Sequence, residues 1–338
     1  MRPLLVDLGL VSGGAERSFA DFATLKKVEA AGVICGPGAA DLFESEGPLG
    51  GRPWSRSVSG ITNLMLDCAR LRRQVATAIQ ATGCSLVYAN GIRAGLICSL
   101  AVPSGIPLVY HHRDLGGPTL LLRRISEASA RWIVASEFVR KSVCGVHKAV
   151  AVVPNGFSFA SMSAVPAEVP GAGPLVVMVA DLVPWKRHDL FAASVALARE
   201  KIPQLRALVV GRERDAEQAR VVRQGLGEIE VIATAGALPY IAAADVLMSP
   251  TDVEPFGRTV IEALHCGTRV VASDVGGAAE LGERFAAIET AASEPVAMSA
   301  ALLAQLARPR VVSDLAEFAI ERTAGKVWDI FSDSTRGS

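Results

Sequence analysis

Residues 251–263 read TDVEPFGRTVIEA and decide how the rest of the chain is interpreted, because they bring two carboxylates, a glycine and a helix start into one short segment. A run of apolar, strand-forming residues precedes them and ends at Pro250. Residues 257–266 are predicted to form a helix, because the glycine that follows stands where glycine commonly ends one. We therefore expect Glu254 in a loop and Glu262 on the helix.

The helix start and the carboxylates are expected to face the same space. Helical side chains lean toward the N-terminus of their helix, so Glu262 should point toward the backbone N–H groups that the first turn leaves without partners. These N–H groups belong to Phe256, Gly257 and Arg258. They suit phosphate oxygens, whereas a carboxylate suits sugar hydroxyls, so the segment predicts a site for a nucleotide sugar.

The segment resembles the E-x7-E element of retaining GT-B glycosyltransferases, those like family 4, with Glu254 and Glu262 as the two acids. Two glutamates at this spacing mean little alone, but the resemblance continues in DVLMSP at residues 245–250 and in CGTRVVASDVGG at residues 266–277. The alternative is a capped core helix with two solvated acids. The resemblance implies an α/β protein of GT-B fold, in which two Rossmann-like, doubly wound parallel-sheet domains face a cleft.

Length and composition agree with two α/β domains. The chain has 338 residues, half of them apolar and few of them aromatic, which favours helices packed on parallel sheets. By resemblance, residues 1–160 form an N-terminal, acceptor-binding domain, and residues 170–317 form a C-terminal domain that binds the nucleotide sugar. A linker rich in Ser, Ala, Pro and Gly lies within residues 154–174, and a final helix at residues 318–338 is expected to cross back onto the first domain.

The spacing of the cysteines and the length of the apolar runs indicate which cofactors and which cellular location to expect. The six cysteines are scattered without a C-x-x-C pair, so neither a zinc site nor a disulfide framework is expected, and the resemblance implies no bound metal or other cofactor. The N-terminus lacks the features of a signal peptide, and the longest uncharged run, residues 94–110, is broken by prolines and is short for a membrane span. We expect a cytoplasmic protein, and no nucleic-acid partner is predicted.

Charge divides unevenly along the chain. Residues 1–150 hold 17 Lys and Arg against 11 Asp and Glu, whereas residues 151–338 hold 17 against 23. The surplus of basic residues in the first half can be explained by solvated helix faces or by an anionic partner. The second explanation leaves open an anionic, lipid-linked acceptor and a peripheral contact with the inner membrane face through the basic N-terminal domain.

Two loops of the first half carry candidate residues. Gly13 and Gly14 follow the first buried strand and resemble the family's Gly-Gly loop, which lies against the donor diphosphate and the acceptor. The stretch is not the G-x-G-x-x-G fingerprint of nicotinamide-binding domains. Asn90 and Arg93 open the loop after a later strand, and the carboxyl ends of parallel strands are where ligands bind, so both are candidates on the acceptor side.

A pair of histidines ends the next strand of the first half. The family places a histidine near the reacting carbon of the donor, and we prefer His111 because it follows the strand directly, with His112 as the alternative and an acceptor-side candidate. A metal pair is not expected, because neighbouring side chains diverge.

The second half contains residues that resemble the family's diphosphate-binding residues. Lys186 matches the family's lysine, but Asp181 stands where an arginine is expected. An acid beside a diphosphate would repel it, so we expect Asp181 to form a salt bridge with Arg187 or Arg212, and Arg212 or Arg214 to supply the missing charge.

The resemblance implies a retaining transfer of a sugar from a nucleotide diphosphate donor to an acceptor hydroxyl. Lys186 and the N–H groups of Phe256 and Gly257 would stabilise the leaving diphosphate, and His111 would lie beside the sugar and the acceptor. Glu254 would hold the sugar hydroxyls and Glu262 those of the ribose.

Two alternatives to a transferase remain at this stage. One is another GT-B enzyme of nucleotide sugars, such as an epimerase, and the other is a non-catalytic subunit that binds them, which the departure at Asp181 keeps open. The base, the sugar, the oligomeric state and the acceptor, whether a glycan, a small molecule or an anionic lipid-linked molecule, are not predicted.

Overall fold

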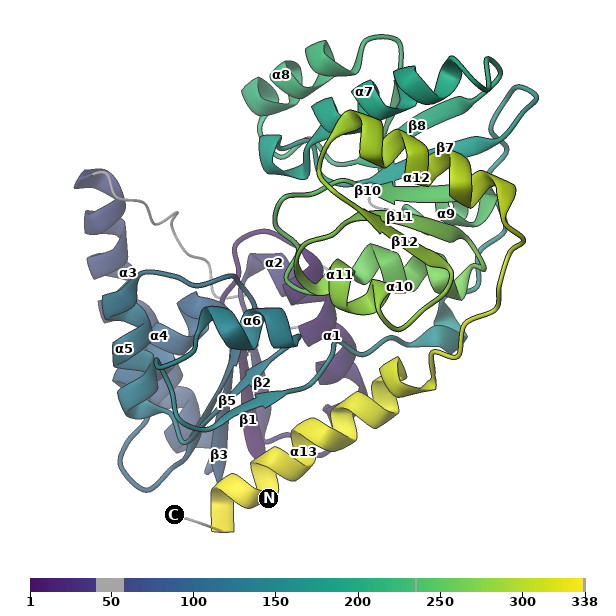
Figure 1. Ribbon diagram of the computed structural model, residues 1–338. Helices are drawn as coiled ribbons and strands as arrows, with labels where there is room; N and C mark the ends of the chain where they lie inside the picture. The colour runs from purple at the N-terminus through teal and green to yellow at the C-terminus, as the bar shows by residue number, and fades with distance from the viewer. Residues whose placement is uncertain (41–57, 235, 337–338) are drawn as a thin grey trace. The chain divides into compact units, whose positions relative to one another are not determined.

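The computed structural model describes residues 1–40, 58–234 and 236–336 and divides the chain into two compact units. Unit 1 comprises residues 1–158 and 316–338, and unit 2 comprises residues 159–315 (Figure 1). The C-terminal part of the predicted linker thus belongs to unit 2. None of the helices in the described part of the chain is long and apolar enough to cross a membrane.

Unit 1 is built on a six-stranded parallel sheet. Its strand order is β2-β1-β3-β4-β5-β6, so the direction of winding changes between β1 and β3. The strands are β1 (Pro3–Asp7), β2 (Gly32–Cys35), β3 (Leu86–Asn90), β4 (Leu108–His112), β5 (Arg131–Val134) and β6 (Val150–Val152). The central strands are buried along their length because both faces of the sheet are covered, and they are mainly apolar up to the polar residues that end β1, β3 and β4.

Helices cover the two faces of this sheet with separate apolar clusters. One cluster joins alternate strand residues such as Leu5 and Val109 to Phe19 and Phe331. The other cluster joins the strand residues that point the opposite way, such as Val6, to the helices on the opposite face. The helices are α1 (Gly14–Lys26), α2 (Pro37–Ala40), α3 (Val58–Thr82), α4 (Gly91–Ala101), α5 (Thr119–Ala128), α6 (Glu137–Ser142) and α13 (Ile320–Arg336). Alternate residues of a strand point to opposite faces, which decides which side chains can meet.

Unit 2 has a second six-stranded parallel sheet with the order β12-β11-β10-β7-β8-β9. The strands are β7 (Leu175–Val179), β8 (Arg206–Gly211), β9 (Glu230–Ala233), β10 (Val246–Ser249), β11 (Arg269–Ser273) and β12 (Ile288–Ala291). Its helices are α7 (His188–Arg199), α8 (Ala216–Leu226), α9 (Leu238–Ala243), α10 (Arg258–His265), α11 (Gly276–Gly282) and α12 (Pro295–Ala307). The predicted α/β class with doubly wound parallel sheets is confirmed.

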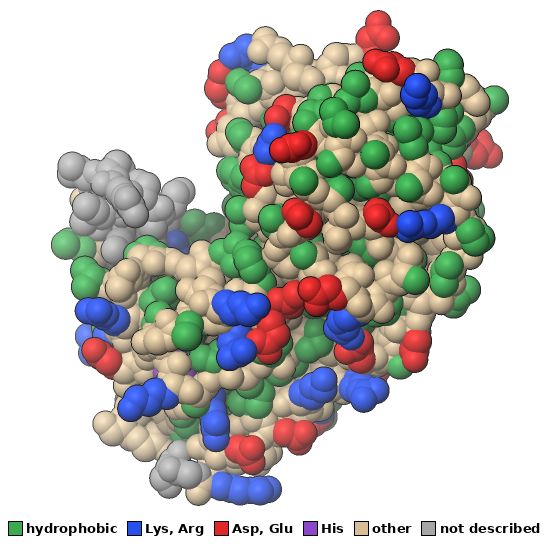
Figure 2. Space-filling view, viewed as in Figure 1, with side chains coloured by type: hydrophobic (Ala, Val, Ile, Leu, Met, Phe, Trp, Pro, Cys, Tyr) green, Lys and Arg blue, Asp and Glu red, His purple; other side chains and the backbone are tan. Residues whose placement is uncertain are grey.

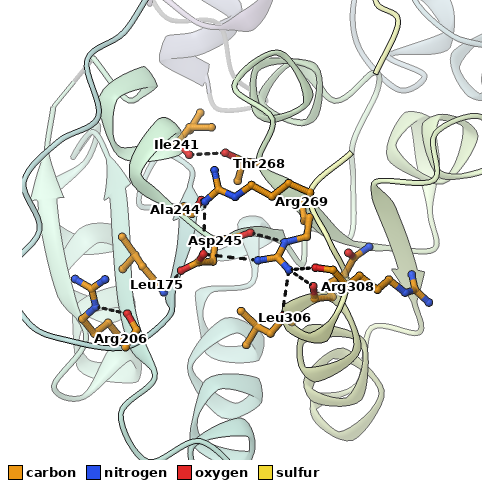
Figure 3. A network of polar contacts seen from close by, with 12 residues as sticks. Leu175, Arg206, Ile241, Ala244, Asp245, Thr268, Arg269, Leu306 and Arg308 are labelled. Atoms are coloured by element: carbon orange, nitrogen blue, oxygen red, sulfur yellow. Dashed lines mark hydrogen bonds and ion pairs between the residues drawn. The ribbon is translucent and has the colours of Figure 1, made fainter. Parts of the chain in front are cut away.

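A polar network ties together the amino ends of the strands in unit 2 (Figure 3). The buried guanidinium of Arg269 donates to the backbone carbonyls of Asp245, Gln305 and Leu306 at 3.1, 2.6 and 3.2 Å, so it caps the last turn of α12. The Asp245 carboxylate accepts the N–H of Leu175 at 2.9 Å. These contacts fix the starts of β7, β10 and β11, and they lie at the edge of the sheet opposite to the carboxyl ends of the strands.

Candidate active site

The predicted donor residues of unit 2 lie in two loops at the point where the winding of its sheet reverses. The chain runs from β7 through β8 to β9 on one side and resumes with β10 on the other side of β7. Ligands of doubly wound sheets bind at such a reversal, beyond the carboxyl ends of the strands. Residues 180–187, here the β7 loop, follow β7, and residues 250–257, here the β10 loop, follow β10.

Three contacts between side chains or backbone fasten the β7 loop to the β10 loop. They are the ion pair of Lys186 Nζ with Glu254 Oε2 (3.2 Å), the hydrogen bond from Thr251 Oγ1 to the carbonyl of Trp185 (3.2 Å) and the ion pair of Arg187 Nη1 with Asp252 Oδ1 (2.8 Å). The structure therefore brings together Lys186 and Glu254, which the sequence marks as candidate catalytic residues 68 positions apart.

Glu254 also organises the turn that leads into α10. Its Oε1 accepts the backbone N–H of Gly257 at 2.9 Å, and its own carbonyl accepts the N–H of Gly277 at 2.8 Å. The expectation that the Gly257 N–H lacks a partner is therefore wrong, because the side chain of Glu254 caps it. Gly257 has φ 101°, a left-handed conformation that glycine adopts without strain.

The two glycines that begin α11 have a function that the sequence analysis did not assign to them. A Cβ on Gly276 would lie 2.3 Å from the carbonyl oxygen of Glu254, and a Cβ on Gly277 would lie 2.5 Å from the backbone of Phe256. The β10 loop can pack this closely only because neither residue has a side chain. The available signal was the string DVGG at residues 274–277, which follows the buried strand β11.

Glu262 lies on α10, as predicted, with only 11% of its side chain exposed. Its Oε1 is 3.9 Å from Nη2 of Arg258, one helical turn earlier, so the carboxylate lies back toward the helix start. Phe256, directly before Gly257, is buried and supports this turn. The three candidate donor residues Phe256, Arg258 and Glu262 thus lie in one helical turn and the loop before it.

The charge of Asp181 is balanced by two arginines of the loop after β8. Arg212 Nε donates to Asp181 Oδ1 at 3.1 Å, and Arg214 forms a second ion pair with the other oxygen. Of the two partners expected for Asp181, Arg212 is confirmed and Arg187 is wrong. Two guanidinium groups against one carboxylate leave a net positive charge beside the β7 loop.

Polar residues form a row across the carboxyl ends of three neighbouring strands in unit 1. Asp7 pairs in register with Asn90, and Asn90 pairs with His111, so the three side chains share the sheet face that α1 and α13 cover. Asn90 Nδ2 donates to Asp7 Oδ2 at 2.6 Å, and Arg113 Nε donates to Asn90 Oδ1 at 2.7 Å. The row lies where the winding of this sheet reverses, between β1 and β3.

His111 is held in this row as a neutral imidazole. Its Nδ1 lies 2.7 Å from the hydroxyl of Tyr88, and only 3% of the residue is exposed. Burial, and next the charge of Arg113, lower the pKa of His111 well below its usual value. Within the described part of the chain its Nε2 is buried without a hydrogen-bond partner.

Glu16 adds a carboxyl group to this row, and the sequence analysis did not select it. A Cβ added to Gly9 would lie 2.5 Å from Glu16 Oε1 and 3.1 Å from Asp7 Oδ1. The two carboxyl groups are therefore close neighbours. Burial, and next the charge of Asp7, raise the pKa of Glu16 to about 7. The signal was its position in the first turn of α1, two residues after the Gly-Gly pair.

The remaining candidates of unit 1 are not all brought to the row. Gly13 and Gly14 begin α1, next to Glu16. Arg93, however, forms an ion pair with Asp67 of α3, and His112 lies on the opposite face of the sheet from His111. The structure therefore does not bring Arg93 or His112 to Asn90, because helix and strand periodicity turn them the other way.

The histidines and acids do not form a metal centre in the part of the chain that is described, where no group of three or more His, Cys, Asp and Glu side chains could hold an ion. His112 Nδ1 instead lies 2.9 Å from the hydroxyl of Tyr110, and its ring stacks on Trp132. The two adjacent histidines thus diverge, as the strand geometry predicts.

The fold agrees with comparisons to known proteins. The protein HepE of Anabaena, solved with UDP and glucose, matches 98% of this chain and 99% of its own with a TM-score of 0.78 and 21% identity. A protein of Listeria monocytogenes assigned as a UDP-N-acetylglucosamine 2-epimerase matches 100% of this chain and 97% of its own with a TM-score of 0.65 and 10% identity. At these identities the likeness shows the fold alone, and the fold is that of the GT-B class.

The match to a protein family lies within unit 2. Residues 173–308 match the model of the family Glycosyl transferases group 1, which confirms the resemblance predicted from the E-x7-E segment.

Curated relatives match the chain in part. A GDP-mannose-dependent alpha-(1-6)-phosphatidylinositol monomannoside mannosyltransferase of Mycolicibacterium smegmatis is 31% identical over 123 residues, 32% of this chain and 32% of the relative. A D-inositol 3-phosphate glycosyltransferase of Segniliparus rotundus is 26% identical over 175 residues, 48% of this chain and 39% of the relative. The matches thus span well under half of the length of these relatives.

Proposed function

We propose that the protein is a retaining glycosyltransferase that moves a sugar from a nucleoside diphosphate donor to an acceptor hydroxyl. The observation that carries the proposal is the contact of Lys186 with Glu254 at the reversal of the unit 2 sheet. A cation suited to phosphate and a carboxylate suited to hydroxyls lie side by side there, as a nucleotide sugar requires. The family match of residues 173–308 supports it.

The residues of unit 2 divide the donor between them in this proposal. The ammonium of Lys186 stabilises the negative charge that grows on the diphosphate as it leaves. Glu254 separates from Lys186 and binds the hydroxyls of the sugar instead. Glu262 accepts the ribose hydroxyls. Because Glu254 already binds the Gly257 N–H, the positive charge that supports Lys186 comes from Arg212 and Arg214 rather than from that N–H group.

Unit 1 supplies the acceptor side. The free Nε2 of neutral His111 and the carboxyl groups of Asp7 and Glu16 offer acceptors for hydroxyl protons at the carboxyl ends of β1, β3 and β4. Asn90 and Arg113 keep the row in place through their hydrogen bonds. A polyhydroxylated acceptor matches this chemistry.

The comparisons suggest which donors and acceptors to try first. HepE was solved with UDP and glucose, and one relative is named for GDP-mannose, so UDP- and GDP-sugars are the first donors. The names of both relatives contain an inositol unit, and one of them a lipid. On the face of unit 1 that Figure 2 shows, Lys and Arg side chains are spread among acidic and apolar ones rather than gathered in one basic patch.

The two alternatives are less well supported. An epimerase shares the fold, but the family match is to glycosyl transferases. A non-catalytic binder was suggested by Asp181, and its ion pairs with Arg212 and Arg214 remove that objection because the acid is neutralised.

Product analysis tests the proposal. The protein is incubated with UDP-glucose, GDP-mannose and related donors and with neutral and phosphorylated inositols, and the products are identified by mass spectrometry. We expect a nucleoside diphosphate and a glycosylated acceptor in equal amounts, with the anomeric configuration of the donor retained. An altered nucleotide sugar without transfer would favour the epimerase, and donor binding without turnover would favour the binding subunit.

A further inference from the structure

Arg187 adopts a backbone conformation that its side chain makes unfavourable. At φ 59° and ψ 48° it lies in the left-handed region, and it is the only non-glycine residue with a positive φ in the described ranges. It ends the short helical turn that carries Lys186 and forms the N-cap of α7. Such strain in a non-glycine residue is concentrated at functional sites, where surrounding contacts maintain it.

The side chain of Arg187 accounts for the absence of glycine at this position. Its Nε and Nη2 donate to Asp189 at 3.1 and 3.2 Å, which fixes the plane of the guanidinium. Its Nη1 then reaches across to Asp252 of the β10 loop at 2.8 Å. Glycine would relieve the backbone strain but would lose this connection between the two loops.

The connection matters because the neighbouring ion pair has to open. Lys186 and Glu254 neutralise each other at 3.2 Å, and a donor that takes the ammonium to its phosphates and the carboxylate to its hydroxyls must separate them. Arg187 and Asp252 are next to these residues in their loops but face each other instead. Their contact can persist while the first pair exchanges partners.

We propose that the Arg187–Asp252 ion pair is a positioning strap, which keeps the β7 and β10 loops in register while Lys186 and Glu254 release each other to bind a nucleoside diphosphate sugar. The inference rests on the proposed function and names two positioning residues, of which the sequence analysis considered only Arg187, and only as a partner of Asp181. The strap does not act as a stabiliser of the fold. Asp252 is 46% exposed and Arg187 28%, and exposed pairs contribute little to stability.

Two variants separate positioning from stability. Arg187→Gly keeps the left-handed backbone and removes the strap, so the melting temperature should stay constant or rise, because glycine has no strain there. Asp252→Asn removes the charge that Arg187 pairs with and leaves the volume almost unchanged. Arg220→Ala is the control, because it removes an arginine that forms a more exposed ion pair with Glu217 on α8, away from the two loops.

Calorimetric titration with UDP and with GDP gives the first readout. We expect each strap variant to bind the preferred nucleotide about tenfold more weakly than the wild type. The double variant should bind no more weakly than either single variant, because both remove one contact. Arg220→Ala should bind like the wild type. Strap variants with wild-type affinity, or a loss of affinity that follows a fall in melting temperature, would overturn the inference.

Hydrogen exchange in the absence of nucleotide gives the second readout and keeps the inference testable even if no nucleotide binds. Amides of residues 182–187 and 251–256 should exchange faster in both strap variants, and those of α8 should not. Unchanged exchange in the loops would overturn the strap. A wild type that binds neither nucleotide but shows the expected exchange would instead count against the proposed function alone.

Discussion

At the scale of single residues, Glu262 and the nucleotide ribose provide a specific test. Glu262→Ala should weaken UDP or GDP binding, because charge-assisted hydrogen bonds contribute roughly 1.5–3 kcal/mol each. The matched ligand is the 2′-deoxy nucleotide. Wild type should prefer the ribose form, and Glu262→Ala should bind both forms alike. A variant that still discriminates against the deoxy form would show that another group holds the ribose.

The pKa of Glu16 predicts a pH dependence of stability. Its pKa rises from the usual 4.5 to about 7 on folding, so between these values the folded state holds a proton that the unfolded state has lost. The free energy of unfolding should therefore fall from this source as pH rises through that range. Urea unfolding at several pH values, compared between wild type and Glu16→Gln, measures it.

The comparison with Glu16→Gln removes the effect of the buried histidines. His111 and His112 have lowered pKa values, so they destabilise the fold as pH falls below about 6.5, in the wild type and in the variant alike. The difference in stability between the two proteins should therefore change with pH in favour of Glu16→Gln as pH rises. A constant difference would mean that Glu16 is already ionised in the folded protein near pH 5.

The site residues that were predicted correctly from the sequence are those that lie within a long sequence motif. Lys186, Glu254 and Glu262 belong to motifs whose neighbours specify a loop or a helix, and the structure places them accordingly. Glu16 was missed because its neighbour Asp7 ends β1, and only the turn from β1 into α1 brings the two carboxyl groups together. A side chain that caps its own loop, as Glu254 does for Gly257, also leaves no mark in sequence spacing.

At the scale of secondary structure elements, the sequence predicted the strands and their alternation with helices. It did not predict on which face of the sheet each side chain at a strand end lies. Arg93 and His112 were assigned to the acceptor side because they follow strands. Whether a residue at a strand end faces α1 or α4 depends on single steps of register, and a one-residue shift reverses it. The strand order also required the structure, and it is this order that makes β7 and β10 neighbours.

The start of α11 yields a prediction about packing between elements. Gly277→Ala should displace the β10 loop, because the new methyl group would meet the backbone of Phe256, and overpacking of this kind costs about 1–3 kcal/mol. Both stability in urea and nucleotide affinity should fall.

Gly225→Ala in α8 is the matched control. That position has open space around it, so alanine should stabilise the helix by up to about 1 kcal/mol and leave binding unchanged. If Gly277→Ala also left stability and binding unchanged, the β10 loop would not depend on the close approach that the structure shows.

At the scale of the whole molecule, the uneven charge of the two halves predicts a dependence on salt. If the basic surplus of residues 1–150 meets an anionic surface, the protein should co-sediment with vesicles that contain phosphatidylglycerol at low salt and less so above about 0.1 M, where screening acts over roughly 10 Å. Arg123→Glu on α5 should reduce the effect, whereas Lys201→Glu in unit 2 should not. Equal behaviour with neutral vesicles would favour an acceptor in solution.

The central claim is that the site at the reversal of the unit 2 sheet performs sugar transfer, and the rate of transfer by Lys186→Ala tests it most directly. With the donor and acceptor that the wild type uses, the variant should turn over about 10²–10³-fold more slowly, because it lacks the cation that meets the leaving diphosphate. Lys201→Ala, which removes an exposed lysine elsewhere in unit 2, should keep the wild-type rate. A Lys186→Ala protein that transfers sugar as fast as the wild type would contradict the account.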